Sequence, residues 1–533
     1  MRPVESESEE TTMIHTAPEP DVEIPEVNVT SFVLEGAAER GSKPALIDGP
    51  SGRELSYAAL ADSVRALAAG LAARGFGRGD VLAVYMPNLP EYAIAFHGAA
   101  SAGGMCTTVN PLYTANELAH QLTDSGARLL LTVPPFLDAA REAADAAGVD
   151  EVFVAGEAEG ATPFAELLGD PGGAPAGEID PQGLAVLPYS SGTTGLPKGV
   201  MLTHANLVSN LCQVQQAFPI AAEDTLIGVL PFFHIYGMTV IMNQGLRAGA
   251  TIVTMPRFDL EQLLDLLERH AVTRAYVVPP IALALAKHPA VEGRDLSALE
   301  TIMSGAAPLG GELSERVASR IGCTVIQGYG LTETSPVTHV IRPDGENVPG
   351  SIGRPLSRTE CRIVDPESGG EVAEGERGEL WIRGPQVMSG YLNNDEATAA
   401  TLDADGWLHT GDIAVVDGDG FFEIVDRLKE LIKYKGYQVA PAELEALLIT
   451  HPAVGDVAVI GVADEEAGEL PKAFVVAAGD ELDPGELMAW VAERVAPQKR
   501  VRMVEEVEEI PKSPSGKILR RVLVERERAA ASG

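Results

Sequence analysis

The chain has 533 residues, of which 45% are hydrophobic and 22% are charged, and a chain of this length folds into several structural units rather than around one core. Lys and Arg number 39 against 77 Asp and Glu, which gives a formal net charge of −38. This balance excludes a broad basic surface, so nucleic acid and anionic membranes are not expected partners. Any polyanion would have to be bound by local groups.

The four cysteines are widely separated and form no CxxC pair (Cys106, Cys212, Cys323 and Cys361). This spacing predicts neither a disulfide framework nor a zinc site, and it fits a reducing, cytoplasmic location. Residues 1–13 carry no basic segment followed by an apolar stretch, so a signal peptide is not predicted.

The first 28 residues hold eight acidic residues and one basic residue among scattered Pro and Ser. This composition predicts a disordered acidic tail over residues 1–28.

Residues 29–428 are predicted to form a large N-terminal domain in which helices and strands alternate. The capping-box sequence TANE at 114–117 precedes the helical pattern LAHQL, and the apolar run RLLLTV follows as a buried strand. The same unit recurs after Asp259, a predicted N-cap, with an extended segment at 275–278. This alternation predicts an α/β fold of layered subdomains with mainly parallel sheets.

Two further segments complete the predicted architecture. Residues 225–246 contain no Asp, Glu, Lys or Arg, but Pro231, His234 and three glycines favour buried core over a membrane span. From about 349 to 424, short β-rich runs between Gly, Asp and Pro turns predict a small antiparallel sheet or β-barrel. Residues 429–533 are expected to be a smaller, mobile α+β C-terminal domain that acts as a lid.

The most informative stretch is LPYSSGTTGLPKGVMLTH at 187–204, where a strand-like run enters a glycine-rich loop. Glycines let backbone N–H groups approach an anion, hydroxyls add donors, and Lys198 adds positive charge. It is not a Walker A loop, because Lys198 precedes Gly199 rather than Ser or Thr. The loop is suited to a polyphosphate.

This loop resembles the signature of the adenylate-forming superfamily of acyl- and aryl-CoA synthetases, peptide-synthetase adenylation domains and luciferases. Further similar segments follow in the family's order: SGAAPLG (304–310), QGYGLTETSP (327–336), GELWIRGPQVMSGYLNNDEAT (378–398), GWLHTGD (406–412), VDRLKELIKYKGYQVAPAELE (425–445) and PKSPSGKILRR (511–521). The resemblance is nearest to coumarate–CoA ligase-like enzymes. It implies an ATP-dependent acid–thiol ligase that releases pyrophosphate, forms an acyl-adenylate and transfers the acyl group to coenzyme A.

The resemblance also implies roles for particular residues around the nucleotide, with Lys433 and Gln438 contacting the adenylate after the C-terminal domain has rotated. Lys517 would be the adenylating lysine, in preference to Lys512, and Glu333 would hold Mg²⁺. The ATP or AMP site would comprise Ser190, Ser191, Gly192, Thr193, Thr194, Lys198, Ala306, Ala307, Pro308, Gln327, Gly328, Tyr329, Gly330, Thr332, Asp412, Arg427, Lys429, Lys433 and Gln438. Within this set, Tyr329 would face the base, Asp412 and Arg427 the ribose, and Lys429 would be the pivot of the C-terminal domain.

For the second step, the resemblance implies a rotation of the C-terminal domain that brings Lys435 and Gly436 to a coenzyme A tunnel. Arg257 would contact a coenzyme A phosphate, and His234 would be a gating residue beside the acyl carboxylate. The acyl pocket would comprise Tyr236, Val240, Met303, Ala306, Gly328, Gly330, Pro336 and Val337.

Small side chains in this pocket favour a flat ring, and Tyr236 would reach a para-hydroxyl group. No Asp lies between residues 231 and 238, so an α-amino acid substrate is not expected. Cinnamate and coumarate stay open, because a pocket distinguishes a missing hydroxyl poorly unless a buried partner is left unpaired. Trp381, where plant ligases commonly have GEICIRG, keeps other aryl acids and medium-chain acids open. The alternatives are a fatty-acyl-CoA synthetase, an acyl-AMP ligase that serves a carrier protein, a luciferase-like oxygenase and a non-catalytic relative.

Overall fold

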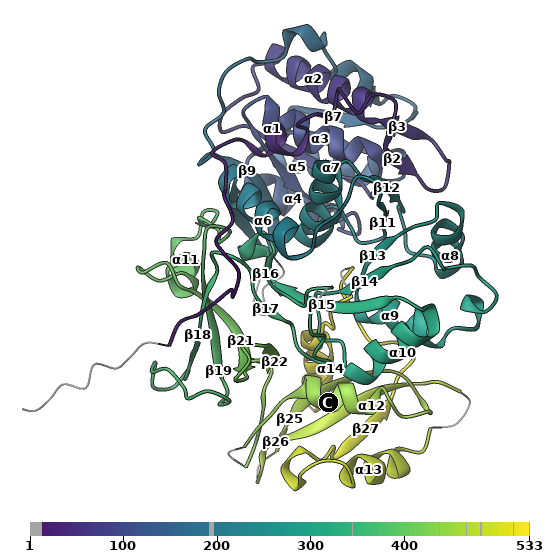
Figure 1. Cartoon of the computed structure of the whole chain (residues 1–533), viewed down its shortest axis with the longest axis vertical. Coiled ribbons are helices and arrows are strands. Elements are labelled where there is room, and N and C mark those ends of the chain that lie inside the picture. Colours follow the sequence, from purple (N-terminus) through teal and green to yellow (C-terminus); the bar gives the residue numbers. More distant parts are fainter. Residues whose placement is uncertain are drawn as a thin grey trace, which may run out of the picture.

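The computed structural model of the chain describes residues 13–190, 197–343, 345–435, 437–464, 466–479, 482–514 and 516–531. Two large sheets with their helices form most of the molecule, a small antiparallel sheet lies beside them, and the C-terminal domain lies at the lower end in Figure 1. The predicted α/β architecture with a smaller α+β domain is confirmed.

The first large sheet has eight strands, and it is parallel from β9 to β8 and antiparallel at β10 and β20. In spatial order these are β20 (Gly390–Tyr391), β10 (Lys198–Thr203), β9 (Leu184–Ser190), β5 (Met105–Thr108), β4 (Val81–Tyr85), β6 (Ala127–Thr132), β7 (Glu151–Val154) and β8 (Thr162–Pro163). Its principal helices are α2 (Tyr57–Ala73), α3 (Pro90–Ser101), α4 (Ala115–Ser125), α5 (Leu137–Ala147) and α6 (His204–Ala217).

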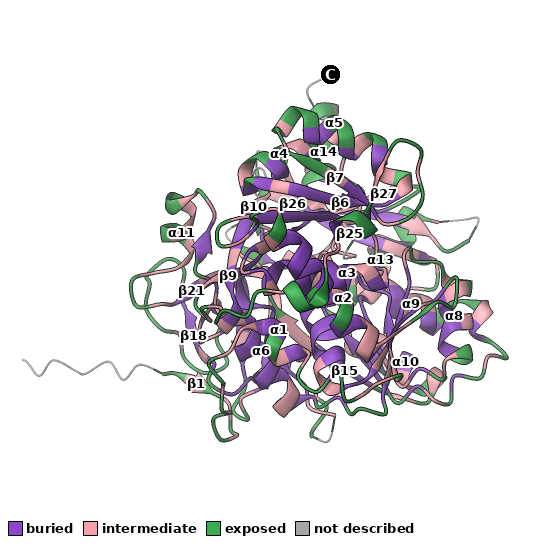
Figure 2. Ribbon diagram, turned by 90° about the horizontal axis from the view of Figure 1, so that it is seen from above, coloured by how far each residue is buried: buried purple, intermediate pink, exposed green. Residues whose placement is uncertain are grey.

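Alternation along β4 shows why this sheet is covered on both faces. Val81, Ala83 and Tyr85 pack into the core formed with α4 and α5, whereas Leu82 and Val84 pack into the core with α2 and α3. Side chains of a strand point alternately to opposite faces, so a strand that is apolar at every position needs helices on both sides. Figure 2 shows such buried strands below helices whose outer faces are exposed.

The second large sheet has nine strands and is parallel from β15 to β2. In order these are β17 (Arg354–Pro355), β16 (Val337–Val340), β15 (Thr324–Gly330), β14 (Thr301–Ser304), β13 (Arg274–Val277), β11 (Thr225–Gly228), β12 (Thr251–Thr254), β2 (Pro44–Asp48) and β3 (Glu54–Ser56). The helices associated with it are α1 (Val29–Val33), α7 (Gln244–Ala248), α8 (Leu260–Arg269), α9 (Pro279–Lys287), α10 (Gly311–Ile321) and the π-helix η4 (Tyr236–Asn243).

Local expectations from the sequence are met in these units. Thr114 and Glu117 form the predicted capping box of α4, and the Asp259 side chain accepts a hydrogen bond from the Gln262 N–H at the start of α8. The charge-free stretch 225–246 folds as β11, η4 and part of α7 within the core. Among the described residues, no helix is long and apolar enough to cross a membrane.

The small sheet is antiparallel and has five strands: β1 (His15–Thr16), β18 (Glu360–Val364), β19 (Gly378–Arg383), β21 (Leu408–Val416) and β22 (Phe422–Arg427). The helix α11 (Asp395–Thr401) lies between β20 and β21 in the chain. Asp412 on β21 pairs in register with Arg427 on β22, so both side chains are carried by one rigid hairpin.

The prediction of a disordered tail over residues 1–28 is wrong for residues 13–28. β1 extends the small sheet, Glu19 forms an ion pair with Arg342 (3.0 Å), and the Val22 N–H donates to the Ser357 hydroxyl (2.8 Å). Sheet-edge pairing orders a segment through its backbone, which an acidic composition does not reveal. Residues 1–12 lie outside the described part of the chain.

The C-terminal domain has a five-stranded sheet made of β24 (Tyr437–Val439), β23 (Ile432–Tyr434), β26 (Gly468–Ala477), β25 (Val454–Asp464) and β27 (Met503–Glu506). Its helices α12 (Pro441–Leu448) and α13 (Pro484–Ala492) pack on one face, and α14 (Arg520–Ala531) packs on the other through Leu523. The domain therefore has its own core.

Candidate active site

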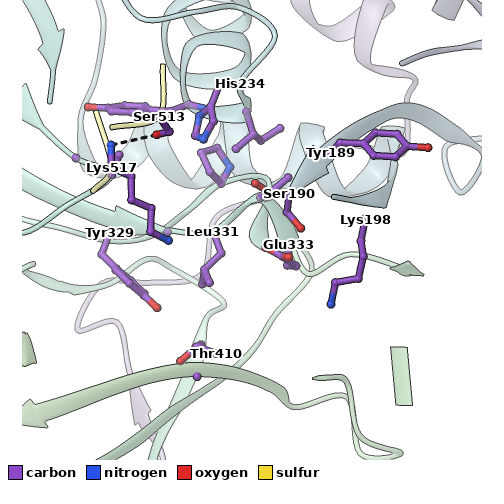
Figure 3. Close-up of a pocket in the computed structure, with 18 of the residues that line it drawn as sticks. Tyr189, Ser190, Lys198, His234, Tyr329, Leu331, Glu333, Thr410, Ser513 and Lys517 are labelled. Atoms are coloured by element: carbon purple, nitrogen blue, oxygen red, sulfur yellow. Dashed lines mark hydrogen bonds between the residues drawn. The ribbon is translucent and has the colours of Figure 1, made fainter. Parts of the chain in front are cut away.

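A cavity of about 660 Å³ lies where the two large sheets, the small sheet and the C-terminal domain meet. The strands β9, β14 and β15 deliver side chains to it from their carboxyl ends, which is where α/β sheets bind ligands. Sixteen residues predicted from the sequence line it: Ser190, Lys198, His234, Tyr236, Met303, Ala306, Gly328, Tyr329, Gly330, Thr332, Glu333, Pro336, Val337, Arg427, Lys429 and Lys517. Figure 3 shows several of them pointing toward one another.

One end of the cavity has the groups that a phosphate chain requires. The Lys198 ammonium lies 4.2 Å from the centre of the Tyr391 ring, and the Tyr391 hydroxyl donates to Glu333 Oε1 (2.8 Å). The buried Ser190 hydroxyl, at the end of β9, has no hydrogen-bond partner in the described part of the chain. A buried hydroxyl without a partner is costly, so a ligand atom is its expected partner.

A second group comes from the small sheet and β15. The Tyr329 hydroxyl donates to Asp412 Oδ2 (2.6 Å), and Arg427 Nε lies 3.2 Å from Asp412 Oδ1. The Asp412 side chain is only 5% exposed and is not part of the cavity wall, so it lies directly behind Tyr329 and Arg427. Asp412 therefore fixes the orientation of two side chains that do face the cavity.

The C-terminal domain contributes Lys517, whose backbone N–H donates to the Ser513 hydroxyl (3.1 Å). Its ammonium points into the centre of the cavity beside Tyr329 (Figure 3) and has no ion-pair partner among the described residues. Loss of solvation there, followed by the charge of Arg427, lowers the pKa of Lys517 to about 8. Lys512 also lines the cavity, but its ammonium pairs with Asp456 Oδ2 (2.5 Å). The geometry thus favours Lys517 over Lys512 as the available cation.

The other end of the cavity is apolar and contains His234 and Tyr236. The Tyr236 N–H donates to His234 Nδ1 (3.3 Å), which leaves Nε2 as the other ring nitrogen available for a ligand. Burial, followed by the charge of Lys517, lowers the pKa of His234 to about 4, so the ring is neutral at pH 7. The Tyr236 hydroxyl donates to the Met303 carbonyl (3.1 Å) and keeps lone pairs for a substrate donor.

Two glycines at this end let neighbouring side chains pack directly on the backbone. A Cβ on Gly305 would lie 2.9 Å from Tyr236 Cε1, and one on Gly328 would lie 2.4 Å from Met303 Cε. Ala306, which follows Gly305, has a left-handed φ of +69°, an uncommon conformation that often occurs at functional sites. The side chains of Tyr236 and Met303 are therefore packed directly on the backbone of the cavity wall.

Some predicted residues lie outside the cavity wall. Gln327 and Val240 are buried behind it, Ala307 is half-buried and Pro308 is exposed. Gln327 accepts a hydrogen bond from the Leu309 N–H (2.8 Å), which fixes the loop after β14. The following are exposed: Arg257, Lys433, Lys435 and Gln438. Predictions on Ser191, Gly192, Thr193, Thr194 and Gly436 concern positions outside the described residues.

Sequence reasoning missed several wall residues from the first sheet and the small sheet. Gln121 on α4 donates to Thr108 O (3.1 Å) and lines the cavity with Thr108 and Tyr189. Glu379 on β19 accepts from the Gly411 N–H (2.9 Å) and lines the cavity, as does Tyr391. Glu379 and Tyr391 lie inside the segment 378–398 that carries the resemblance, so that segment was the available signal.

The donor set at the phosphate end fits a magnesium ion carried by a nucleotide. Glu333 supplies a carboxylate oxygen, the ligand type that Mg²⁺ prefers, beside groups suited to phosphate. The described residues contain no cluster of three or more His, Cys, Asp or Glu that could form a cage. A cation here would therefore depend on phosphate oxygens for most of its coordination, which is usual for Mg²⁺ in nucleotide sites.

A cavity between two domains, with Lys198 at one end and Lys517 supplied by the C-terminal domain, is the arrangement expected of an adenylate-forming enzyme. The family model described as AMP-binding enzyme matches residues 33–392, and the one described as AMP-binding enzyme C-terminal domain matches residues 443–517. The chain belongs to the AMP-binding enzyme family and, within it, to the AMP-forming acid–CoA ligases.

Curated relatives cover almost the whole chain. It is 44% identical over 523 residues to 4-coumarate–CoA ligase 3 of Oryza sativa subsp. japonica, covering 96% of this chain and 94% of that relative. It is also 44% identical over 529 residues to 4-coumarate–CoA ligase of Vanilla planifolia, covering 96% of each.

Solved structures of other ligases have the same fold as this chain. The anthranilate CoA ligase AuaEII in complex with anthranoyl-AMP has a TM-score of 0.89 at 28% identity, covering 96% of this chain and 99% of that one. ATP-bound MatB from Rhodopseudomonas palustris has a TM-score of 0.85 at 30% identity, with 94% and 99% covered.

Proposed function

We propose that the chain activates a cinnamate- or coumarate-like aryl carboxylic acid with ATP and transfers it to coenzyme A. The observation that carries this proposal is the lining of one cavity, which has Lys198 and Lys517 for ATP and an end lined by Tyr236, Met303 and glycines for an apolar ring. Similarity to 4-coumarate–CoA ligases along nearly the whole chain supports the choice of acid.

In the proposed ATP site, Ser190, Lys198 and the loop residues Ser191–Thr194 hold the phosphates, with Thr332 beside them. Glu333 would hold Mg²⁺, which supplies charge neutralisation at the phosphates when it is bound. Tyr329, Ala306 and Gly328 would lie against adenine. Asp412 and Arg427 would hold the ribose: Arg427 lines the cavity, and Asp412 lies directly behind Arg427 and Tyr329.

The first step is an in-line substitution at the α-phosphorus. A carboxylate oxygen of the acid forms a bond to this phosphorus, the bond to the bridging oxygen breaks, and pyrophosphate leaves with its electron pair. Negative charge grows on the α-phosphoryl oxygens, and the Lys517 ammonium, which makes no other ion pair among the described groups, is available to stabilise it. Holding both reactants in one cavity supplies the remaining advantage.

In the second step the thiol sulfur of coenzyme A attacks the acyl carbon, the acyl–oxygen bond breaks, and AMP leaves while the thiol loses its proton. His234 lies beside the acyl end and is neutral at neutral pH, so it can gate access there without adding charge. We assign Lys435, Gly436 and Arg257 to coenzyme A. Because Lys433, Lys435 and Gln438 are exposed and outside the cavity, this step requires a second arrangement of the C-terminal domain, pivoting at Lys429.

The acid is the least constrained part of the proposal, so a carboxylate panel tests it. Cinnamate, coumarate, benzoate, octanoate and palmitate would be assayed for AMP and thioester formation that depends on coenzyme A. We expect coumarate and cinnamate to give the highest kcat/KM. Saturation at low concentration by palmitate alone would overturn the aryl assignment. Adenylate formation without any thioester would instead favour a carrier-protein ligase, and oxygen consumption would favour an oxygenase.

A further inference from the structure

A buried ion-pair group lies next to Lys517 in the chain. Arg520, three residues later at the start of α14, pairs with Glu430 and with Glu445 Oε2 (2.6 Å), and its Nε donates to Val459 O (3.2 Å). The three charged side chains are 12–16% exposed. Such a group, satisfied on every side, is rigid and costly to disturb. The segment that follows Lys517 is therefore held by α12, which carries Glu445.

The N-terminus of α12 is completed by a residue of a different unit. Its N-cap residue Ala440 makes no side-chain cap bond and its first residue is Pro441, whereas the Ala442 N–H donates to Asp426 Oδ2 (2.8 Å). Asp426 is on β22 of the small sheet, and its other oxygen accepts from the Arg427 N–H (2.7 Å). A carboxylate at a helix N-terminus satisfies an orphan donor and is favoured by the helix dipole.

These contacts form one continuous path from the small sheet to the cavity. Asp426, which is 4% exposed, caps α12; Glu445 of α12 holds Arg520; and Arg520 fixes the end of the loop that presents Lys517. The direct contact between α12 and β22 makes this a docking point for the C-terminal domain (Figure 1). The next residue, Arg427, faces the cavity and contacts Asp412, so two adjacent residues of β22 serve the lid and the ligand respectively.

We propose that Asp426 is a positioning residue for adenylation: by capping α12 it docks the C-terminal domain so that Arg520 holds the Lys517 ammonium in the cavity. This inference rests on the proposed two-step reaction. It predicts a selective effect, because Asp426 has no place in the chemistry and acts only in the arrangement in which Lys517 is in the cavity.

The test compares both steps in Asp426→Asn, which keeps the shape of the side chain but removes its charge. We expect the kcat of adenylate formation to fall about tenfold or more, as for the loss of one charged hydrogen bond, with much smaller changes in KM. Thioester formation from supplied acyl-adenylate and coenzyme A should be unchanged. The pH at which the adenylation rate falls on the alkaline side should also move above 8, because an undocked Lys517 regains solvent and its pKa rises.

The matched control is Asp417→Asn. Asp417 lies in the turn between β21 and β22 and likewise accepts two backbone N–H bonds, from Asp419 and Phe421, but its side chain makes no hydrogen bond or ion pair with the described residues of the C-terminal domain. It should leave both steps as in the wild type. Arg520→Lys is the second variant, because a lysine keeps the charge yet cannot bridge Glu430 and Glu445 as a guanidinium does. The Arg520→Lys variant should likewise lose adenylation and keep thioester formation. It keeps the test decisive if Asp426→Asn fails to fold.

The outcomes separate this inference from the proposed function. A wild-type enzyme that forms no adenylate from any acid of the panel would contradict the proposed function. A wild-type enzyme that does so, together with an Asp426→Asn variant of equal adenylation rate, would overturn the role of Asp426. Equal loss of both steps, or an unmoved alkaline limb, would also overturn it, because general damage to the fold would give that result.

Discussion

Two lysine-bearing segments of the C-terminal domain differ sharply in their surroundings. The 512–519 loop places Lys517 inside the cavity with no ion-pair partner among the described residues. The β23–β24 hairpin carries Lys433 and Lys435 on the exposed surface, where Lys435 pairs with Glu466 (3.2 Å). Both segments are expected to serve the same active site, yet only the 512–519 loop lines the cavity.

This difference indicates that the observed arrangement of the two domains suits adenylate formation rather than thioester formation. A cation that is held in the cavity, with its pKa lowered by desolvation, is suited to stabilising the charge that the proposed reaction develops on the α-phosphate. An exposed ion pair such as Lys435–Glu466 contributes little to stability and is easily exchanged for another partner. We therefore expect the Lys517 loop to serve adenylation and the hairpin to serve the thioester step after the domain has moved.

Removing the Lys517 ammonium should have the largest effect, because it removes the cation that distinguishes the 512–519 loop from the hairpin. Lys517→Ala should lower the rate of adenylate formation by about 10²–10³, the usual cost of one preorganised donor at a developing charge. Pyrophosphate release in a single turnover measures this step. Thioester formation from supplied acyl-adenylate should be largely retained, and Lys512→Ala should cost far less. A normal rate of adenylation in Lys517→Ala would refute the assignment.

The pH profile sharpens the role of the same lysine. Its pKa is lowered to about 8, so the cationic form is present below that pH and is lost as pH rises through it. The adenylation rate should fall above about pH 8, whereas Lys517→Arg should retain its reduced rate at higher pH, because a guanidinium stays protonated. Initial rates between pH 6 and 10 measure this. An alkaline limb that persists in Lys517→Arg would assign the titration to another group.

The hairpin should show the converse selectivity. Lys435→Ala should lower the thioester step by about tenfold, as for one charged hydrogen bond, while adenylation is unaffected. The matched control, Glu466→Gln, removes the same surface ion pair but keeps Lys435, and it should slow neither step. If CoA KM and second-step rate in Lys435→Ala equalled those of the wild type, the hairpin would have no such role.

The smallest expected effect concerns the acid. Tyr236→Phe should reduce the preference for coumarate over cinnamate by several-fold, corresponding to about 1 kcal/mol for a neutral hydrogen bond. Tyr276→Phe is the control, because the Tyr276 hydroxyl lies outside the cavity wall and bonds no described residue. The ratio of kcat/KM values for the two acids is the measurement. An equal change in both variants would remove Tyr236 from para-hydroxyl recognition.

The sequence was most informative where local chemistry decides the structure. The capping box at Thr114, the N-cap Asp259 and the apolar strands each depend on near neighbours, and each is present. Lys517 and Glu333 were found because long motifs surround them. Long-range contacts were not predictable: β1 is ordered by pairing with a strand some 345 residues away, and Asp426 caps a helix of another unit. Gln121 was missed because its segment resembles an ordinary capped helix.

The central claim is that an aryl acid is activated as an acyl-adenylate in this cavity, and oxygen-labelled coumarate tests it most directly. With both carboxylate oxygens labelled as ¹⁸O, a single turnover with ATP and coenzyme A should yield AMP that carries one ¹⁸O atom and a thioester that keeps the other. Unlabelled AMP, the formation of ADP, or turnover with palmitate but none with coumarate would contradict the account.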